Sequence, residues 1–377
     1  MFDIFISTIA MSVACFSLFL LPKDHPTRAL SLVLICLVFL SAGSVVFNLL
    51  PALTQVYVSL IPSIFFLLIP AFWLYHDALI SVKPWCWDNK LLKHFVTVPI
   101  AMLLSIALLV LPEEDFKQMF FSSEPVSKWW LSLLSMLFFI GVLSWCVLSC
   151  AYAISILRRT AKYQKRIKLV YADKSGRNLN WIVITSILIV FTWVYGLIVL
   201  ALEDQLLDYG VSETGTLILL AIVVWLVAHN GIRQRPGFVE IQDEPNALND
   251  QTNKKPYERS SSGQNDLNRI SSKLSVAVDR DKVHFDSALN LPKLSKHIGE
   301  PSQYISQTLS QQLNTTFFDY INTARINEAK ELLLGTSNSI LEIAYAIGFN
   351  SKSSFYKAFR QDMDMTPTQY RKSQPIR

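Results

Sequence analysis

The sequence predicts an all-α protein with two unlike parts: a seven-transmembrane-helix bundle, followed by a polar domain of amphipathic helices. Hydrophobic residues make up 51% of the 377 residues and charged residues only 17%, against roughly 25% charged in ordinary soluble proteins. The apolar residues are concentrated before about residue 230. From Leu267 onward apolar residues recur at spacings of three and four, the pattern of helices with one buried face. We therefore expect a membrane domain over 1–235, a linker over 236–266 and a second domain over 267–377.

Crossing the hydrocarbon core of a bilayer requires about 20 apolar residues in a helix. The expected spans are 4–21, 29–50, 56–75, 95–111, 129–157, 181–202 and 215–228. The fifth is long enough to tilt in the bilayer or to extend into the cytoplasm. The first carries Asp3 where a signal peptide would have basic residues, and a second span follows almost at once, so we interpret it as a span.

The basic residues predict the orientation of these spans. If the N-terminus lies outside, the inside connections 22–28, 76–94 and 158–180 hold two, three and eight Lys or Arg residues. The outside connections 51–55, 112–128 and 203–214 then hold none, two and none. Because Lys and Arg are enriched in cytoplasmic loops, we expect a multi-pass protein of the bacterial cytoplasmic membrane with its C-terminus in the cytoplasm.

The membrane part shows no sign of enzymatic chemistry. Its span interiors lack the ionisable groups of a proton relay or an intramembrane hydrolase, and its five cysteines lack metal-type spacing. We expect no catalytic residue, metal or cofactor. Since the outside loops are short, the stimulus would be a small molecule entering the bundle, a property of the bilayer or a membrane partner. Pro62, Pro70 and Pro99 either kink spans around a cavity or belong to helix packing.

Residues 236–264 are rich in Asn, Asp, Gln, Ser and Pro and show neither helical nor strand periodicity. Such a segment cannot bury enough apolar surface to order itself. It predicts a flexible tether that spans about 30 Å on average.

Two segments of the C-terminal domain resemble each other. Residues 291–317 superpose on 340–367 with a shift of 49 residues, and of 50 after the turn. Leu294, Ser295, Ile298 and Gly299 match Ile343, Ala344, Ile347 and Gly348; Ile305, Leu309, Asn314 and Thr316 match Phe355, Phe359, Asp364 and Thr366. This pattern is typical of two helix-turn-helix units, expected at about 291–313 and 340–361.

The matched positions have physical roles in such a unit. The glycines end the first helix in a left-handed conformation, which Asn314 and Asp364 also tolerate before the next element. Ser302, and Asn350 or Ser351, are candidate caps of the second helices. Thr316 would cap a linking helix up to Leu334, about 28 Å long, which would hold the reading helices one duplex turn apart.

The motifs of this domain resemble the AraC/XylS family of transcription regulators. They are Phe317-x-x-Tyr320, Arg325-Ile326-x-x-Ala329, Ile343-Ala344, Gly348-Phe349, Ser354-Phe355-x-x-x-Phe359 and Thr366-Pro367-x-x-Tyr370-Arg371. The resemblance covers about 267–375 and implies a cytoplasmic, seven-helix, double helix-turn-helix DNA-binding domain. The whole chain looks like the membrane-bound branch of the family, in which a multi-span sensor precedes this domain.

The resemblance also implies the DNA-contacting residues. In the first reading helix they are Gln303, Ser306 and Gln307; in the second they are Lys352, Ser353, Tyr356 and Lys357, with Arg360 nearer phosphate. Gln suits adenine and Lys suits guanine in the major groove. Phe349, Phe355 and Phe359 are expected in the core.

The expected partners are double-stranded promoter DNA and the lipid bilayer. Residues 340–377 hold six basic and three acidic residues, so phosphate attraction is modest, and a homodimer would add avidity. RNA polymerase is a further expected partner of a promoter-bound regulator. The alternative is a membrane receptor or scaffold whose C-terminal helices bind a protein; the polar faces of both reading helices argue against it.

Overall fold

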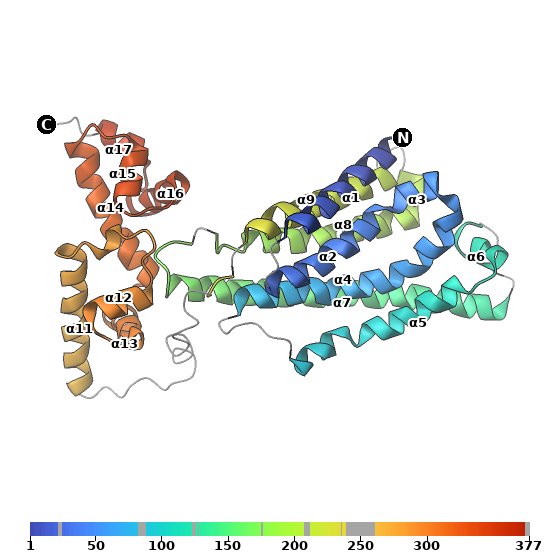
Figure 1. Ribbon diagram of the computed structural model, residues 1–377, viewed down its shortest axis with the longest axis horizontal. Helices are drawn as coiled ribbons and strands as arrows, with labels where there is room; N and C mark the ends of the chain where they lie inside the picture. The colour runs from blue at the N-terminus through green and yellow to red at the C-terminus, as the bar shows by residue number, and fades with distance from the viewer. Residues whose placement is uncertain are drawn as a thin grey trace. The chain divides into compact units, whose positions relative to one another are not determined.

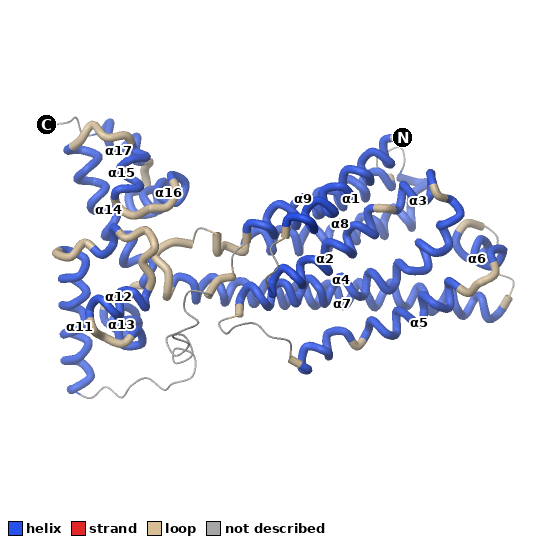
Figure 2. The backbone as a smooth tube through the Cα atoms, viewed as in Figure 1, coloured by secondary structure: helices blue, strands red, loops and turns tan. Residues whose placement is uncertain are grey.

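The computed structural model describes residues 1–21, 25–81, 88–122, 126, 128–174, 176–206, 212–234, 236–238 and 261–373. Within these ranges every regular element is a helix (Figure 2), and the one extended pairing is an isolated bridge between Tyr171 and Asn290. The chain divides into two compact units. The first contains Met1–Ser81, Trp85–Thr160 and Leu179–Pro236; the second contains Ala161–Asn178 and the C-terminal part from Gly237 onward.

The first unit is a bundle of long apolar helices (Figure 1). They are α1 (Phe2–Leu20), α2 (His25–Ser41), α3 (Gly43–Leu49), α4 (Thr54–Ile80), α5 (Thr97–Leu109), α6 (Glu113–Phe120), α7 (Trp129–Lys168), α8 (Asn180–Leu206) and α9 (Glu213–Arg233). Among the described residues, seven helical segments are long and apolar enough to cross a membrane. α1 packs against α2 and α9, and α4 packs against α2 and α5.

Several helix bounds differ from the expected spans. The second expected span is broken at Ala42 into α2 and α3, and α4 continues five residues beyond Tyr75, to Ile80. The extension is stabilised because Asp77 forms an ion pair with Arg159 of α7 and because His76 Nε2 lies 2.9 Å from Thr160 Oγ1. α7 continues past the fifth expected span to Lys168.

The bundle exposes many large apolar side chains, and its interior includes small polar ones. Large exposed side chains include Phe16, Phe19, Leu103, Phe139, Val147, Ile187 and Trp225. Buried polar side chains include Ser7, Ser59, Ser105, Ser149, Thr185 and Ser186. Ser63 and Ser105 hydroxyls join α4 to α5 at 2.7 Å. Small hydrogen-bonding residues at helix contacts are typical of membrane proteins, whereas soluble proteins rarely expose apolar surface on this scale.

The C-terminal part of the second unit contains seven helices among its described residues (Figure 1). They are α11 (Ser261–Asp279), α12 (Leu291–Ile298), α13 (Ser302–Gln307) with a π-helical turn (Thr308–Gln312), α14 (Phe317–Gly335), α15 (Ile340–Ala346), α16 (Lys352–Met363) and α17 (Pro367–Ser373). α12 and α13 form the first helix-turn-helix unit, α15 and α16 form the second, and α14 links them. The expected core residues Phe349, Phe355 and Phe359 are confirmed as buried.

α11 begins at Ser261, earlier than the expected start at Leu267 and inside the expected linker. Adding residues to an existing helix costs far less than starting one, so the amphipathic stretch that begins at Leu267 can extend toward the N-terminus. The rest of the expected tether, residues 239–260, lies outside the described residues.

The turns have the backbone that the repeat predicts. Gly299 and Gly348 have φ of 67° and 91°, and Asn314 and Asp364 have φ of 48° and 53°. These four left-handed predictions are confirmed. Thr316 is also confirmed as a cap, since its hydroxyl accepts the backbone N–H of Asp319 at 3.1 Å.

The two glycines differ in their surroundings, which gives a matched test. A Cβ at Gly348 would lie 2.7 Å from His284 O and 2.8 Å from Phe285 O, whereas a Cβ at Gly299 would meet nothing within 4 Å. We expect Gly299→Ala to cost about 1–2 kcal/mol from the left-handed backbone alone. Gly348→Ala should cost about 1–3 kcal/mol more, because the crowding atoms are backbone. Hydrogen exchange in the full chain in lipid nanodiscs measures the first cost at the α12 and α13 amides and the second at the α15 and α16 amides; equal losses would contradict the crowding.

Candidate nucleic-acid interface

The second reading helix, α16, presents one continuous polar face. Its side chains Lys352, Ser353, Lys357 and Arg360 are exposed, at the three- and four-residue spacings that place residues on one side of a helix. The opposite side, with Phe355 and Phe359, is buried in the core. The polar face is therefore held outward by the packing of the aromatic face.

Tyr356 is half-buried and its position is fixed from both sides. Its hydroxyl lies 3.1 Å from Thr368 Oγ1 of α17, and Lys352 Nζ lies 5.4 Å from the centre of its ring. α17 thus orders the middle of the reading face.

The first reading helix, α13, differs from the expectation at one position. Gln303 and Gln307 are partly exposed, but Ser306 is only 7% exposed. The reason is helical spacing, since Ser306 falls on the buried stripe that also contains Ser302, Ile305 and Leu309. Ser306 is therefore not available to contact base edges in this structure, and the face is carried by Gln303 and Gln307.

The π-helical turn after α13 adds a residue that the sequence did not indicate. Gln311 is exposed, and its Oε1 accepts a hydrogen bond from Gln307 Nε2 at 3.2 Å. Single π-helical turns often occur at functional sites. The sequence repeat aligns two regular helices in each unit, so it gives no indication of a π-helical turn after α13.

The two helix-turn-helix units differ in how their second helices are capped. Ser351 caps α16, because its hydroxyl accepts the N–H of Ser354 at 3.1 Å. Ser302 does not cap α13, whose N-cap is Pro301, and its buried hydroxyl has no hydrogen-bond partner among the described residues. The proposed cap at Ser302 is therefore wrong. Asn350 is not the cap either; it donates to Ser287 O at 3.0 Å.

The buried side chain of Arg325 connects the linking helix α14 to the segment before the first helix-turn-helix unit and to the second helix-turn-helix unit. Arg325 of α14 is fully buried; its Nε donates to His284 O at 2.7 Å and its Nη2 to Asp286 O at 2.9 Å. Its guanidinium lies 5.4 Å from the ring centre of Phe349. Burial lowers the pKa of Arg325 to about 10, against the opposite influence of Asp173 and Asp286. The group therefore stays charged at neutral pH.

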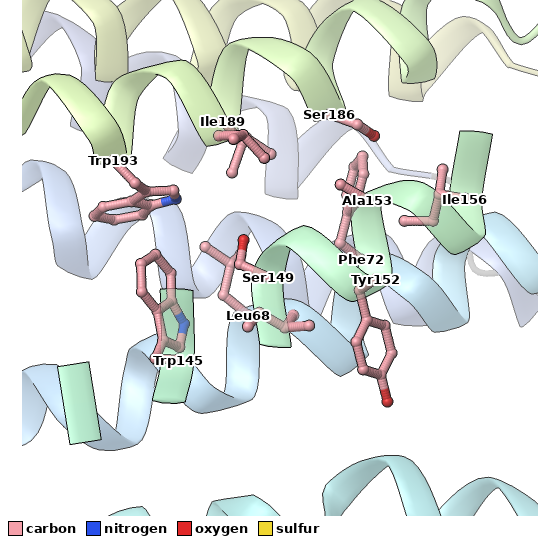
Figure 3. A pocket seen from close by; sticks show the side chains of 12 residues that line it. Leu68, Phe72, Trp145, Ser149, Tyr152, Ala153, Ile156, Ser186, Ile189 and Trp193 are labelled. Carbon is pink, nitrogen blue, oxygen red and sulfur yellow. The ribbon is translucent and has the colours of Figure 1, made fainter. Parts of the chain in front are cut away.

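The first unit contains an apolar pocket between α4, α7 and α8, a second candidate site (Figure 3). It is lined by Leu68, Phe72, Ser149, Ile189 and others, and Trp145 and Trp193 meet edge to face at 4.4 Å beside it. Its volume of about 40 Å³ is far below the roughly 300 Å³ of typical small-molecule sites. In this structure the pocket is a packing gap, which a ligand would have to widen.

No cluster of His, Cys, Asp and Glu residues that could hold a metal ion is found within the described ranges. The polar faces of α13 and α16 and the pocket of Figure 3 are thus the candidate sites of the described residues.

Comparison with known proteins identifies the C-terminal domain. Residues 294–373 match the family model described as "Helix-turn-helix domain". Over 103 residues the chain is 34% identical to an uncharacterized HTH-type transcriptional regulator of Staphylococcus aureus strain COL, covering 27% of this chain and 14% of the relative. Over 89 residues it is 36% identical to the melibiose operon regulatory protein of Escherichia coli strain K12, covering 24% of this chain and 30% of the relative.

Among solved structures, the chain is similar to the C-terminal domain of AraT, a response regulator from Geobacillus stearothermophilus. The identity is 27%, the TM-score is 0.25, and the match covers 32% of this chain and 91% of that chain. The matched stretch spans about a seventh of the staphylococcal relative and less than a third of the E. coli one. The C-terminal part of this chain therefore contains a helix-turn-helix domain of the AraC type, and its relatives are transcription regulators.

The caps give a second matched test. Ser351→Ala should destabilise α16 by about 1 kcal/mol, because it removes an N-cap. Ser302→Ala should be neutral or slightly stabilising, because its buried hydroxyl has no partner to lose. Hydrogen exchange of the first-turn amides of each helix reports the difference. Equal losses at both positions would show that the cap assignment is mistaken.

Proposed function

We propose that this protein is a membrane-embedded, one-component transcription regulator that binds promoter DNA through α13 and α16 under control of a signal received in the bilayer. The observation that carries the DNA-binding part is the match of residues 294–373 to the helix-turn-helix family, together with the exposed cationic face of α16. The proposed contacts are Gln303, Gln307, Lys352, Ser353, Tyr356, Lys357 and Arg360.

The surface chemistry of the first unit supports membrane embedding. Only 11% of the most apolar stretch of α7 is buried, although this stretch is strongly hydrophobic. Hydrophobic surface of this extent is stable in contact with lipid and costly in water. Some interior hydroxyls bond to neighbouring backbone, as Ser186 does to Ile182 O at 2.7 Å, whereas those of Ser7, Ser59 and Thr185 have no hydrogen-bond partner among the described residues. Insertion in a bilayer accounts for the exposed apolar surface.

The character of the reading faces favours DNA over a protein partner. Protein-binding surfaces depend on buried apolar anchors at their centre. The faces of α13 and α16 instead carry amides, hydroxyls and cations, with Lys357 and Arg360 exposed. Such groups pair with base edges and phosphates.

A second copy of the chain and RNA polymerase complete the proposed partners. Few positive charges lie on the reading faces, so a single domain would bind weakly at physiological salt. Two chains held in one membrane would raise the effective concentration of the second domain.

Replacing the cations of α16 tests the proposed DNA contacts. Lys352→Ala with Lys357→Ala should weaken binding to the preferred duplex by at least tenfold, since a well-placed base contact contributes about 1–3 kcal/mol. The measurement uses the full chain in nanodiscs and a duplex that the wild-type protein has enriched from a random pool. Membrane insertion should not change, because both residues lie outside the apolar helices.

The control replaces two exposed cations of the same domain that lie outside both reading helices, Arg280 and Lys296. This variant loses the same charge and should keep most of its affinity. Equal effects in the two variants would reject Lys352 and Lys357 as specific contacts. No enriched duplex for the wild-type protein would reject DNA reading altogether.

Reporter fusions test the proposed orientation. A reporter inserted after Ser212 should be active outside the cytoplasm, and one inserted after Asn249 should be active in the cytoplasm, because one expected span separates the two positions. An alkaline phosphatase and a fluorescent protein, each placed at both positions, report the compartments. A C-terminal domain on the outer side could not reach DNA and would end the proposal.

A further inference from the structure

The connection between α7 and α8 packs on the DNA-binding domain within the second unit. We name residues Leu169–Lys174 the strap. Leu291 N–H donates to Val170 O at 2.8 Å, and Ala172 N–H donates to Leu289 O at 3.4 Å. Val170 is fully buried, and Ala172 nearly so. The strap is therefore joined by backbone to the start of α12, in the first helix-turn-helix unit.

The strap also contacts the linking helix α14 and the second helix-turn-helix unit. Asn322 of α14 donates from Nδ2 to Ala172 O at 3.0 Å. Asn350, directly before the cap of α16, donates from Nδ2 to Asp173 Oδ2 at 2.5 Å. The Asp173 charge also opposes the fall in the pKa of the buried Arg325 that desolvation causes. Contacts to three parts of one domain fix the strap in a single position.

This docking places two lysines against the first turn of α14. Lys174 Nζ lies 4.0 Å from the ring centre of Phe318, and Lys168 Nζ lies 5.8 Å from it. The pKa of Lys174 is lowered to about 8, mainly by burial and also by the charges of Lys168 and Lys357, while Asp319 opposes the shift. Phe318 lines a pocket together with Gln361 and Asp362 of α16, so Lys174 lies beside the reading helix, where the charge of Lys357 acts on it.

Asp319 offsets only part of this positive charge, since its carboxylate raises the pKa of Lys174. Asp319 accepts from Thr316 Oγ1 at 2.7 Å, and Asp362 pairs with Lys330 at 3.2 Å. Within the part of the chain that the structure describes, no ion pair joins Lys168, Lys174 or Lys357 to an acid. Three cations beside a reading helix therefore form a surface with surplus positive charge, complementary to a polyanion.

We propose that Lys168 and Lys174 contact the DNA phosphate backbone beside the groove read by α16, so that the connection between two membrane spans supplies part of the DNA-binding surface. This inference rests on the proposed DNA-binding function. It assigns the two lysines a positioning role, because phosphate contacts fix register and orientation without reading sequence.

Anionic lipid headgroups are the other polyanion that a basic juxtamembrane segment meets. The packing favours DNA for these two residues. Lys162, Lys165 and Arg166 of the same connection are exposed, whereas Lys168 and Lys174 lie on Phe318 of the DNA-binding domain. The first three suit a lipid surface, and the last two extend the surface of the reader.

The test is the salt dependence of DNA binding by the full chain in phosphatidylcholine nanodiscs, with the duplex enriched by the wild-type protein. Each lost phosphate contact reduces the slope of log affinity against log salt by about 0.9. Lys168→Gln with Lys174→Gln should therefore reduce the slope by about 1.8 and weaken binding most at low salt. Lys174→Arg should retain its contact and the wild-type slope.

The matched control is Lys162→Gln with Lys165→Gln, which removes the same charge from exposed positions of the same connection. It should leave the slope unchanged. Hydrogen exchange at the Leu291 amide, which donates to the strap, should stay slow in all variants, which shows that the strap remains docked.

An unchanged slope in the Lys168 and Lys174 variant would overturn the inference, as would an equal change in the control. An unchanged slope with loss of bound phosphatidylserine, in discs that contain it, would assign the lysines to lipid instead. If the wild-type protein enriches no duplex, the proposed function itself fails, and that outcome is recognised before any variant is made.

Discussion

The arrangement of the DNA-binding domain depends on one buried cation. Arg325 has no exposed surface, and its guanidinium donates to His284 O and Asp286 O before the first helix-turn-helix unit while packing near Phe349 of the second. Burying a charge costs several kcal/mol unless hydrogen bonds and an opposite charge compensate. Those partners come from three separate stretches of chain, so the charge is stable only when all three are in place. This requirement sets the relation between the two reading helices more strictly than apolar packing would.

One of these stretches belongs to the connection between α7 and α8. Asp173 contributes opposite charge near Arg325 and accepts a hydrogen bond from Asn350. α7 is a continuous helix from Trp129 to Lys168, and the strap follows it directly. Near the start of that extension, Arg159 forms an ion pair with Asp77 and lies 4.8 Å from the Trp73 ring. These contacts fix α7 to α4 within the first compact unit.

The sequence predicted the helices and turns because their signals are local. Apolar runs of about 20 residues identify spans, and a residue such as Asn314 adopts a left-handed backbone wherever the chain needs one. The cap at Ser302 was misassigned, and the burial of Ser306 was not foreseen, because a family pattern gives positions on a helix but not the depth at which each side chain packs. The role of Asp173 and Lys174 could not be predicted, because it depends on contacts across about 150 residues, such as that between Ala172 and Asn322. Eight basic residues in one connection were fully explained by positive-inside topology.

The docked strap has a physical consequence for the proposed control of DNA binding. A helix can transmit torque and displacement to a segment that directly follows it, since its backbone hydrogen bonds keep it stiff. The strap contacts the start of α12, the linking helix and the residue before the cap of α16. A rotation or shift of α7 would therefore act on both reading units and on the lysines proposed to hold DNA. Coupling of this kind requires two arrangements of a packed element whose populations the signal shifts, and the strap is the element whose contacts would have to exchange.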